Sequence, residues 1–200
     1  RRGAGLRGPK ATGRQQGMQA AMRRVTPLDK LLGVEDLLVT LIIHHGEKHI
    51  VVKDVEGNDI ELPIAQYIYL DMSDDEFRFH NELYNRILQE TLEHLEDENF
   101  VAETYFANHP DPEVSRIASL PTGEQEVSTA SLQLQLNAEK LRQFVFKDLL
   151  SFRTHYIAQR LIEVQQEFAR NPTNRELVEE FMKLKKMNSL LASQTNSVFN

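Results

Sequence analysis

The chain has 200 residues, with 23 Lys and Arg against 30 Asp and Glu, a formal net charge of −7 and 40% hydrophobic residues. This length allows one large domain or two small ones with a hydrophobic core. No run of about 18 apolar residues is present, so we expect no membrane-spanning helix. The chain contains no cysteine, which excludes disulfides, thiolate metal sites and cysteine nucleophiles and suits a reducing compartment.

The charge is unevenly distributed along the chain. Residues 1–30 carry eight basic side chains and one acidic one, a net charge of +7, whereas residues 31–200 carry 15 basic and 29 acidic ones, a net charge of −14. Residues 1–27 are rich in Gly, Arg and Gln, and such a composition buries too little surface to offset the entropy of ordering. We therefore predict a basic, flexible linker or arm over 1–27. Because the chain begins at Arg1, we expect a piece of a longer protein.

The next segment predicts helices and one small β-hairpin. Thr26 as N-cap and Pro27 at the first helical position predict a helix, whose wide apolar stripe continues to Gly46. Two β-branched runs, 49–53 and 60–62, lie on either side of a Gly-Asn turn and predict a hairpin. A short helix opened by a proline is expected after it, over 64–70.

The segment Ser73–Glu76 has the capping serine and the acids of a helix start. Two interpretations of the residues after it are open: one helix as far as Leu95, or a short turn and then a helix that begins at Asn81. The apolar spacing between 83 and 95 favours the second. Two short helices and a polar loop are expected next, over 100–108, 112–120 and 121–136.

The last third predicts a helical hairpin. No Gly or Pro occurs from about 138 to 169, and apolar residues recur at helical spacing, which predicts one long helix. Thr173 with Glu176 forms a sequence capping box for a second helix that ends near Ser193. A short turn makes two such helices antiparallel neighbours.

Together these elements predict a mostly α fold: a helical bundle with a small β-hairpin, followed by a long helix and a C-terminal helical hairpin. We assign the bundle to residues 28–150 and the hairpin to 151–200, with the long helix of about 138–169 bridging the two.

No group of side chains predicts catalysis. His44, His45, Glu47 and His49 form the densest set of metal-ligand types, but Gly46 and the strand separate them, which favours solvated or capping histidines. The acids near 74–76 and 96–98 suit a helix start and a solvent-facing turn. The chain has no glycine-rich phosphate loop and no hydrolase or kinase motif. We therefore expect a non-catalytic fragment without a metal or cofactor site.

Binding is the function class that remains. The long helix and the last helix carry more apolar residues than a single helix–helix seam covers, and these either pack on the bundle or contact another protein. We select six side chains as candidate contacts with a partner, and each of them also suits a position in the seam between the two helices: Tyr156, Arg160, Leu161, Phe181, Leu184 and Leu191.

The order of these elements resembles a known family. The motifs that carry the resemblance are Glu35-Asp36-Leu37-Leu38 leading to His45-Gly46, Asp74-Asp75-Glu76-Phe77, Asn81 with Leu83-Tyr84 and Ile87, Tyr105-Phe106 with Asn108-His109, Asp111-Pro112-Glu113-Val114, and the closing helix pair. From about Leu31 onward the chain resembles the C-terminal, helicase-binding region of bacterial DnaG-type DNA primase. The apparent hairpin at 49–62 departs from that family's common helical core.

The resemblance implies a helical bundle and a helical hairpin joined by one long helix. It implies binding to the N-terminal domain of the DnaB-type replicative helicase, with the hairpin as the main contact, in the cytoplasm at the replication fork. The zinc-binding and magnesium-dependent catalytic domains of the family lie upstream and are absent here. The alternative hypothesis is a helical nucleic-acid-binding protein that contacts DNA through residues 1–30.

Overall fold

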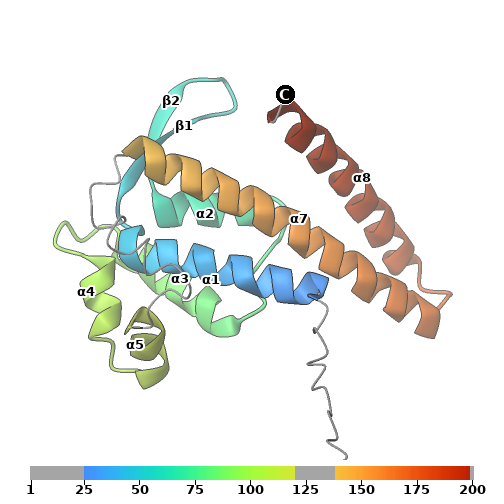
Figure 1. Ribbon diagram of the computed structural model, residues 1–200, viewed down its shortest axis with the longest axis horizontal. Helices are drawn as coiled ribbons and strands as arrows, with labels where there is room; N and C mark the ends of the chain where they lie inside the picture. The colour runs from blue at the N-terminus through green and yellow to red at the C-terminus, as the bar shows by residue number, and fades with distance from the viewer. Residues whose placement is uncertain (1–24, 120–137, 199–200) are drawn as a thin grey trace, which may run out of the picture.

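The computed structural model describes residues 25–119 and 138–198, and the side chains of the last helix as far as Ser193. Residues 1–24 of the arm predicted over 1–27 and the predicted loop at 121–136 lie outside the described residues, and Pro27 is the first residue of α1. The described residues form seven α-helices and one two-stranded sheet (Figure 1), namely α1 Pro27–His45, β1 His49–Lys53, β2 Asp59–Pro63, α2 Ile64–Ser73, α3 Glu82–His94, α4 Ala102–Ala107, α5 Pro112–Ser119, α7 Ala138–Arg170 and α8 Arg175–Val198. The mostly α fold with a small β-hairpin is confirmed.

Helix α1 begins and ends where the sequence predicts. The Thr26 hydroxyl accepts a hydrogen bond from the backbone N–H of Asp29 at 3.1 Å, and the Asp29 carboxylate accepts one from the backbone N–H of Thr26 at 2.9 Å. At the other end, a Cβ on Gly46 would lie 2.9 Å from Cγ2 of Thr91 on α3. Glycine therefore lets α3 approach the end of α1 closely.

The predicted β-hairpin is present. β1 and β2 pair in antiparallel register, with Ile50 opposite Leu62. Gly57 in the connecting turn has φ +87°, a backbone conformation that side-chain-bearing residues rarely adopt. Ile50 and Val52 are buried and β1 packs on α7, so the β-hairpin packs against one side of the bundle.

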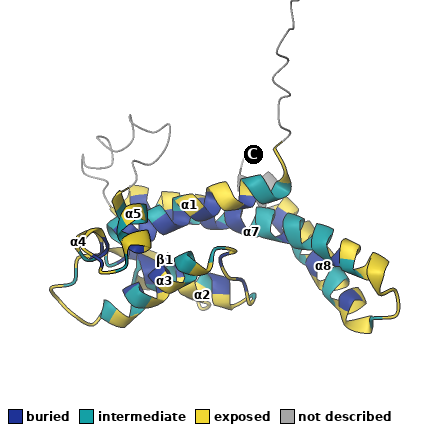
Figure 2. Cartoon of the chain, turned by 90° about the horizontal axis from the view of Figure 1, so that it is seen from below, coloured by how far each residue is buried: buried dark blue, intermediate teal, exposed yellow. Residues whose placement is uncertain are grey.

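The core lies mainly between α1 and α7. Figures 1 and 2 show these two helices running alongside one another, with α2 and α3 beside them, and the buried residues concentrated along that contact. Leu38 and Ile42 of α1 and Phe152 and Ile157 of α7 are fully buried. Burying one such side chain stabilises a fold by about 1.5–3 kcal/mol. Residues on both sides of the predicted 150/151 boundary thus contribute to one core.

The predicted helix start at Ser73–Glu76 is wrong. These residues end α2: the backbone N–H of Phe77 donates to the carbonyl of Met72 at 2.8 Å, and Glu76 has φ 61°. The acids suit a helix start, but Met72 and Phe77 are both buried, and burying them places the turn between them. The second interpretation is confirmed, because α3 begins after Asn81, whose side chain accepts from the backbone N–H of Leu83 at 3.0 Å.

The predicted capping box of Thr173 and Glu176 is also wrong. Asn174 caps α8, since its side-chain oxygen accepts from the backbone N–H of Glu176 at 3.0 Å, and the Thr173 hydroxyl donates to the Asn171 side chain at 3.2 Å. The turn after the long helix is therefore one residue longer than expected, and α8 continues past Ser193 to Val198. The long helix and the two short helices α4 and α5 match their predictions closely.

Candidate interaction surface on the helical hairpin

Helix α7 serves two structural units. Its N-terminal part packs in the bundle, and its C-terminal part extends beyond α1 and pairs with α8, which returns antiparallel to it (Figure 1). Figure 2 shows mostly exposed residues at the tip of this hairpin, in contrast to the bundle. The hairpin is thus the part of the described chain that projects from the bundle.

The seam between α7 and α8 resembles a coiled coil. Leu177, Leu184 and Leu191 of α8 recur at intervals of seven residues and are all buried. Ile157 and Val164 of α7 are buried as well. A seven-residue repeat keeps one stripe of a helix facing one neighbour, which makes a narrow seam. Among the described elements, only α7 packs extensively against α8. Most of the surface of α8 therefore remains accessible.

Arg160 lies at the centre of an ion network. Its guanidinium donates to Glu180 on α8 at 2.6 and 3.0 Å, and to Glu163 and Glu167 on α7 at 3.2 and 3.0 Å. The hydrogen bond to Glu180 and the neighbouring carboxylates raise the pKa of Arg160. A paired charge next to the seam helps to set the register of the two helices.

The structure brings the six sequence-predicted contact residues together along this hairpin. Leu184 and Leu191 are buried, Leu161 and Phe181 are half-buried against the same core, and Arg160 is engaged by three glutamates. Tyr156 packs on Phe77 of the bundle, with 4.3 Å between ring centroids. Direct contact of all six with a partner stays a prediction. In this conformation Tyr156 packs on the bundle, and the other five lie in or beside the seam.

An apolar groove lies beside the seam at the tip of the hairpin. It has a volume of about 340 Å³ and is lined by Val164, Gln165, Phe168, Leu177, Val178 and Phe181. Phe168 on α7 is 40% exposed and Val178 on α8 is 46% exposed. Sequence periodicity missed both as candidate contacts, because it detects apolar residues but not which of them lack a neighbour.

The base of the hairpin is tied to the bundle by Arg153. This guanidinium donates to the Asp71 carboxylate at 2.9 Å and to the Asp71 carbonyl at 2.7 Å, and it also pairs with Asp75. It therefore satisfies a carbonyl near the C-terminus of α2 and links α2 to α7. Lys183 of α8 lies 3.5 Å from Glu76 in the turn after α2, an exposed contact.

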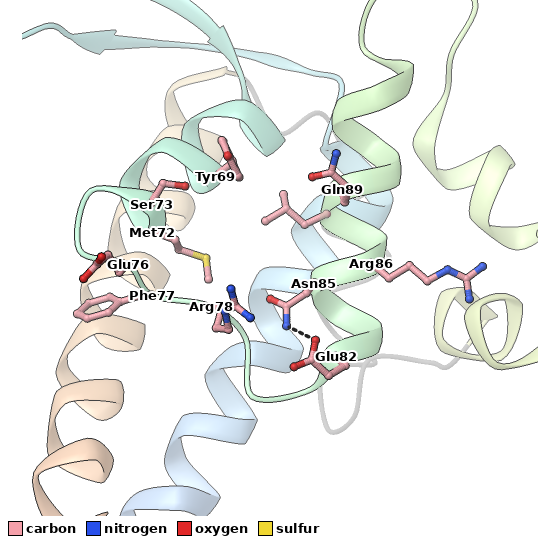
Figure 3. Close-up of a pocket in the computed structure, with 11 residues that line it drawn as sticks. Tyr69, Met72, Ser73, Glu76, Phe77, Arg78, Glu82, Asn85, Arg86 and Gln89 are labelled. Carbon is pink, nitrogen blue, oxygen red and sulfur yellow. Dashed lines mark hydrogen bonds between the residues drawn. The ribbon is translucent and has the colours of Figure 1, made fainter. Parts of the chain in front are cut away.

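A larger, polar cavity of about 680 Å³ opens between α2 and α3. Figure 3 shows Tyr69, Met72 and Ser73 on one wall and Asn85 and Gln89 on the other. The Asn85 side-chain amide has a structural role, because it accepts a hydrogen bond from the backbone N–H of Phe79 and donates one to the Phe79 carbonyl, both at 2.9 Å. Among the described residues the lining contains no group of three metal-ligand side chains.

Two titratable groups away from the hairpin, His45 and Glu35, have structural partners. Burial lowers the pKa of His45 to about 4, and its Nδ1 lies 2.8 Å from Nζ of Lys48. Burial also raises the pKa of Glu35, although its carboxylate accepts a hydrogen bond from the backbone N–H of His80 at 2.7 Å. Within 25–119 and 138–198, His44, His45 and His49 join no cluster able to hold a metal ion.

Comparison with known proteins places the chain in a family. Residues 20–198 match the family described as a domain of unknown function, DUF8430. The chain belongs to the DUF8430 family. The match spans the bundle and the hairpin together, so both units are part of this DUF8430 domain. No curated protein matches the chain, and no solved structure does so either. In the part of the DUF8430 domain that the structure describes, no helix has the length and apolar character to cross a membrane.

Proposed function

We propose that this DUF8430 domain is a non-catalytic interaction domain of a bacterial DNA primase that binds the N-terminal domain of the DnaB-type replicative helicase. Binding of this kind couples primer synthesis to the replication fork in the cytoplasm. The order of a bundle, one long helix and a helical hairpin supports the proposal, because the resemblance to the DnaG-type helicase-binding region implies that arrangement.

The observation that carries the proposal is the apolar groove at the hairpin tip. Phe168 and Val178 expose apolar surface outside the bundle core. An apolar groove between two helices suits an amphipathic helix or inserted apolar side chains of a partner protein. The hairpin also projects from the bundle (Figure 1), so the groove that its residues line is accessible to a large partner such as a helicase domain.

The test is a calorimetric titration of the whole chain with the purified helicase N-terminal domain from the same source. We expect Phe168→Gln and Val178→Thr each to weaken binding about tenfold, since the exposed anchors of an interface carry most of its affinity. The matched control is Phe144→Gln, because Phe144 is on the same helix and is 41% exposed but lies in the bundle half. We expect this variant to bind normally.

Two outcomes would overturn the proposal: no binding by the unaltered chain, or equal binding by all three variants. Circular dichroism establishes that each variant keeps its helix content. Point variants are preferable to truncation at Ser151, because the part of α7 beyond that residue supplies the buried Phe152 and the Arg153 bridge to the bundle. Removing them would unfold both units at once.

A further inference from the structure

Helix α8 carries a second line of side chains, three apolar and one a lysine, on the side away from α7. Val178, Met182, Lys186 and Leu190 recur at intervals of four residues, a spacing that keeps side chains on neighbouring parts of one helix face. Met182 is 65% exposed and Leu190 is 56% exposed, both more than Val178. The line begins at Val178, which also lines the groove, so the two surfaces are continuous.

This face is basic within an acidic molecule. Lys183 and Lys185 flank the line on either side, Glu179 is exposed beside its first turn, and no acid occurs between 181 and 200. Residues 31–150 carry eight basic and 24 acidic side chains, a net charge of −16, whereas residues 151–200 carry seven basic and five acidic ones, a net charge of +2. The net charge therefore changes sign between residues 31–150 and residues 151–200, because the acids and not the bases become fewer.

We infer that the lysine face, made of Val178, Met182, Lys183, Lys185, Lys186 and Leu190, docks on an acidic helical surface of the helicase N-terminal domain. The inference rests on the proposed function and specifies the chemistry of the partner surface. Met182 and Leu190 are desolvated at the centre of the contact. The lysines form a rim that steers the encounter and pairs with partner carboxylates.

A protein surface suits this face better than nucleic acid or a membrane. Two exposed aliphatic side chains between lysines match the apolar centre and polar rim of a protein interface. Single-stranded nucleic acid is bound by aromatic side chains on which bases stack; the six residues of the lysine face include none, and the exposed Phe168 lies in the adjoining groove. The net charge of −16 on residues 31–150 also repels the many phosphates of a long polyanion or an anionic membrane.

The experiment measures association and dissociation rates of the whole chain with the helicase N-terminal domain between about 50 mM and 0.5 M salt. We expect the triple variant Lys183→Gln, Lys185→Gln, Lys186→Gln to associate about tenfold more slowly at low salt, and the difference to disappear at high salt. The double variant Met182→Gln, Leu190→Gln should instead dissociate about tenfold faster.

The matched control is the triple variant Lys48→Gln, Lys53→Gln, Lys147→Gln, which changes the net charge by the same amount on the exposed surface of the bundle. We expect it to associate like the unaltered chain. If both triple variants associate equally fast, the inference is overturned while the proposed function stands.

If the unaltered chain does not bind the helicase domain at any salt concentration, both the proposed function and the inference are overturned. A parallel titration uses single-stranded and double-stranded DNA oligonucleotides. DNA binding that only the α8 triple variant loses would overturn the assignment of this face to a protein partner.

Discussion

The guanidinium of Arg160 on α7 meets the carboxylate of Glu180 on α8 through two hydrogen bonds, 2.6 Å from Nε to Oε1 and 3.0 Å from Nη2 to Oε2. The two side chains are only about one-third exposed, so solvent screens the pair less than a fully exposed one. This two-hydrogen-bond ion pair joins α7 and α8, the two helices of the hairpin, and the first prediction concerns it.

Arg160→Lys keeps the charge but loses the planar fork, and we expect it to lower the free energy of unfolding by about 1 kcal/mol. A double-mutant cycle with Glu180→Gln, measured by urea denaturation, should give a coupling energy of about 0.5–1.5 kcal/mol. The pair of Arg142 and Glu139 is the control, because both are exposed on a single helix, and its coupling should be close to zero. Equal coupling in both pairs would contradict the prediction.

The second prediction separates the two sides of α8. Leu184→Ala removes a buried seam side chain and should lower the free energy of unfolding by about 2–4 kcal/mol. Met182→Ala, two residues away on the exposed side, should change it by less than about 0.5 kcal/mol. Urea denaturation followed by circular dichroism measures both. A larger loss for Met182→Ala than for Leu184→Ala would contradict the assignment of seam and outer face.

The third prediction concerns Glu76, which has φ 61° in the turn that ends α2. This left-handed conformation costs an L-residue about 1–2 kcal/mol, and glycine adopts it freely. We therefore expect Glu76→Gly to raise the free energy of unfolding by about 0.5–1 kcal/mol and the melting temperature with it. Calorimetric melting curves measure this gain.

Two variants control for other effects of the Glu76 substitution. Glu76→Ala loses the exposed contact with Lys183 but keeps the strained backbone, so it should not stabilise the protein. Asp74→Gly introduces the same residue at φ −57° and should lower stability by about 0.5–1 kcal/mol. Stabilisation by Asp74→Gly as well would show that backbone strain at Glu76 is not the cause.

The fourth prediction concerns pH. The pKa of His45 is about 4 in the folded protein, lowered mainly by burial, against 6.5 ordinarily. Between these values the unfolded chain binds a proton that the folded one excludes, so stability falls as the pH falls from 6.5 to 4. The loss contributed by His45 should reach at most about 3 kcal/mol.

Denaturation curves at several pH values should show a shallower pH dependence in His45→Gln than in the unaltered chain. Parallel curves for His45→Gln and the unaltered chain would contradict the prediction.

The candidate site depends partly on sequence pattern and partly on packing. Leu184 and Leu191 stand out in the sequence because they repeat at helical spacing, and the repeat does place them on one face. Phe168, Val178 and Met182 are equally apolar, but their importance lies in the absence of a covering helix. Periodicity reports the hydrophobicity of a position, whereas exposure depends on how many neighbours a helix has in space.

Local chemistry alone determined the element order of this protein. The Thr26 cap, the glycine turn at Gly57 and the unbroken stretch of 138–169 act through the backbone of their own segment, so the sequence predicts them correctly. The charge contrast between the basic residues 1–30 and the acidic remainder is likewise a property of the sequence.

The tertiary structure decided which contacts form between segments that are distant in the sequence. Ser73–Glu76 has the residues of a helix start, yet burial of Met72 and Phe77 makes it a helix end. Arg160 looks like a free contact residue until α8 places Glu180 beside it. In both cases the stabilising contact joins residues that are far apart in the sequence, so the local sequence does not encode it. For the same reason, only the folded hairpin shows which face of α8 is exposed to solvent.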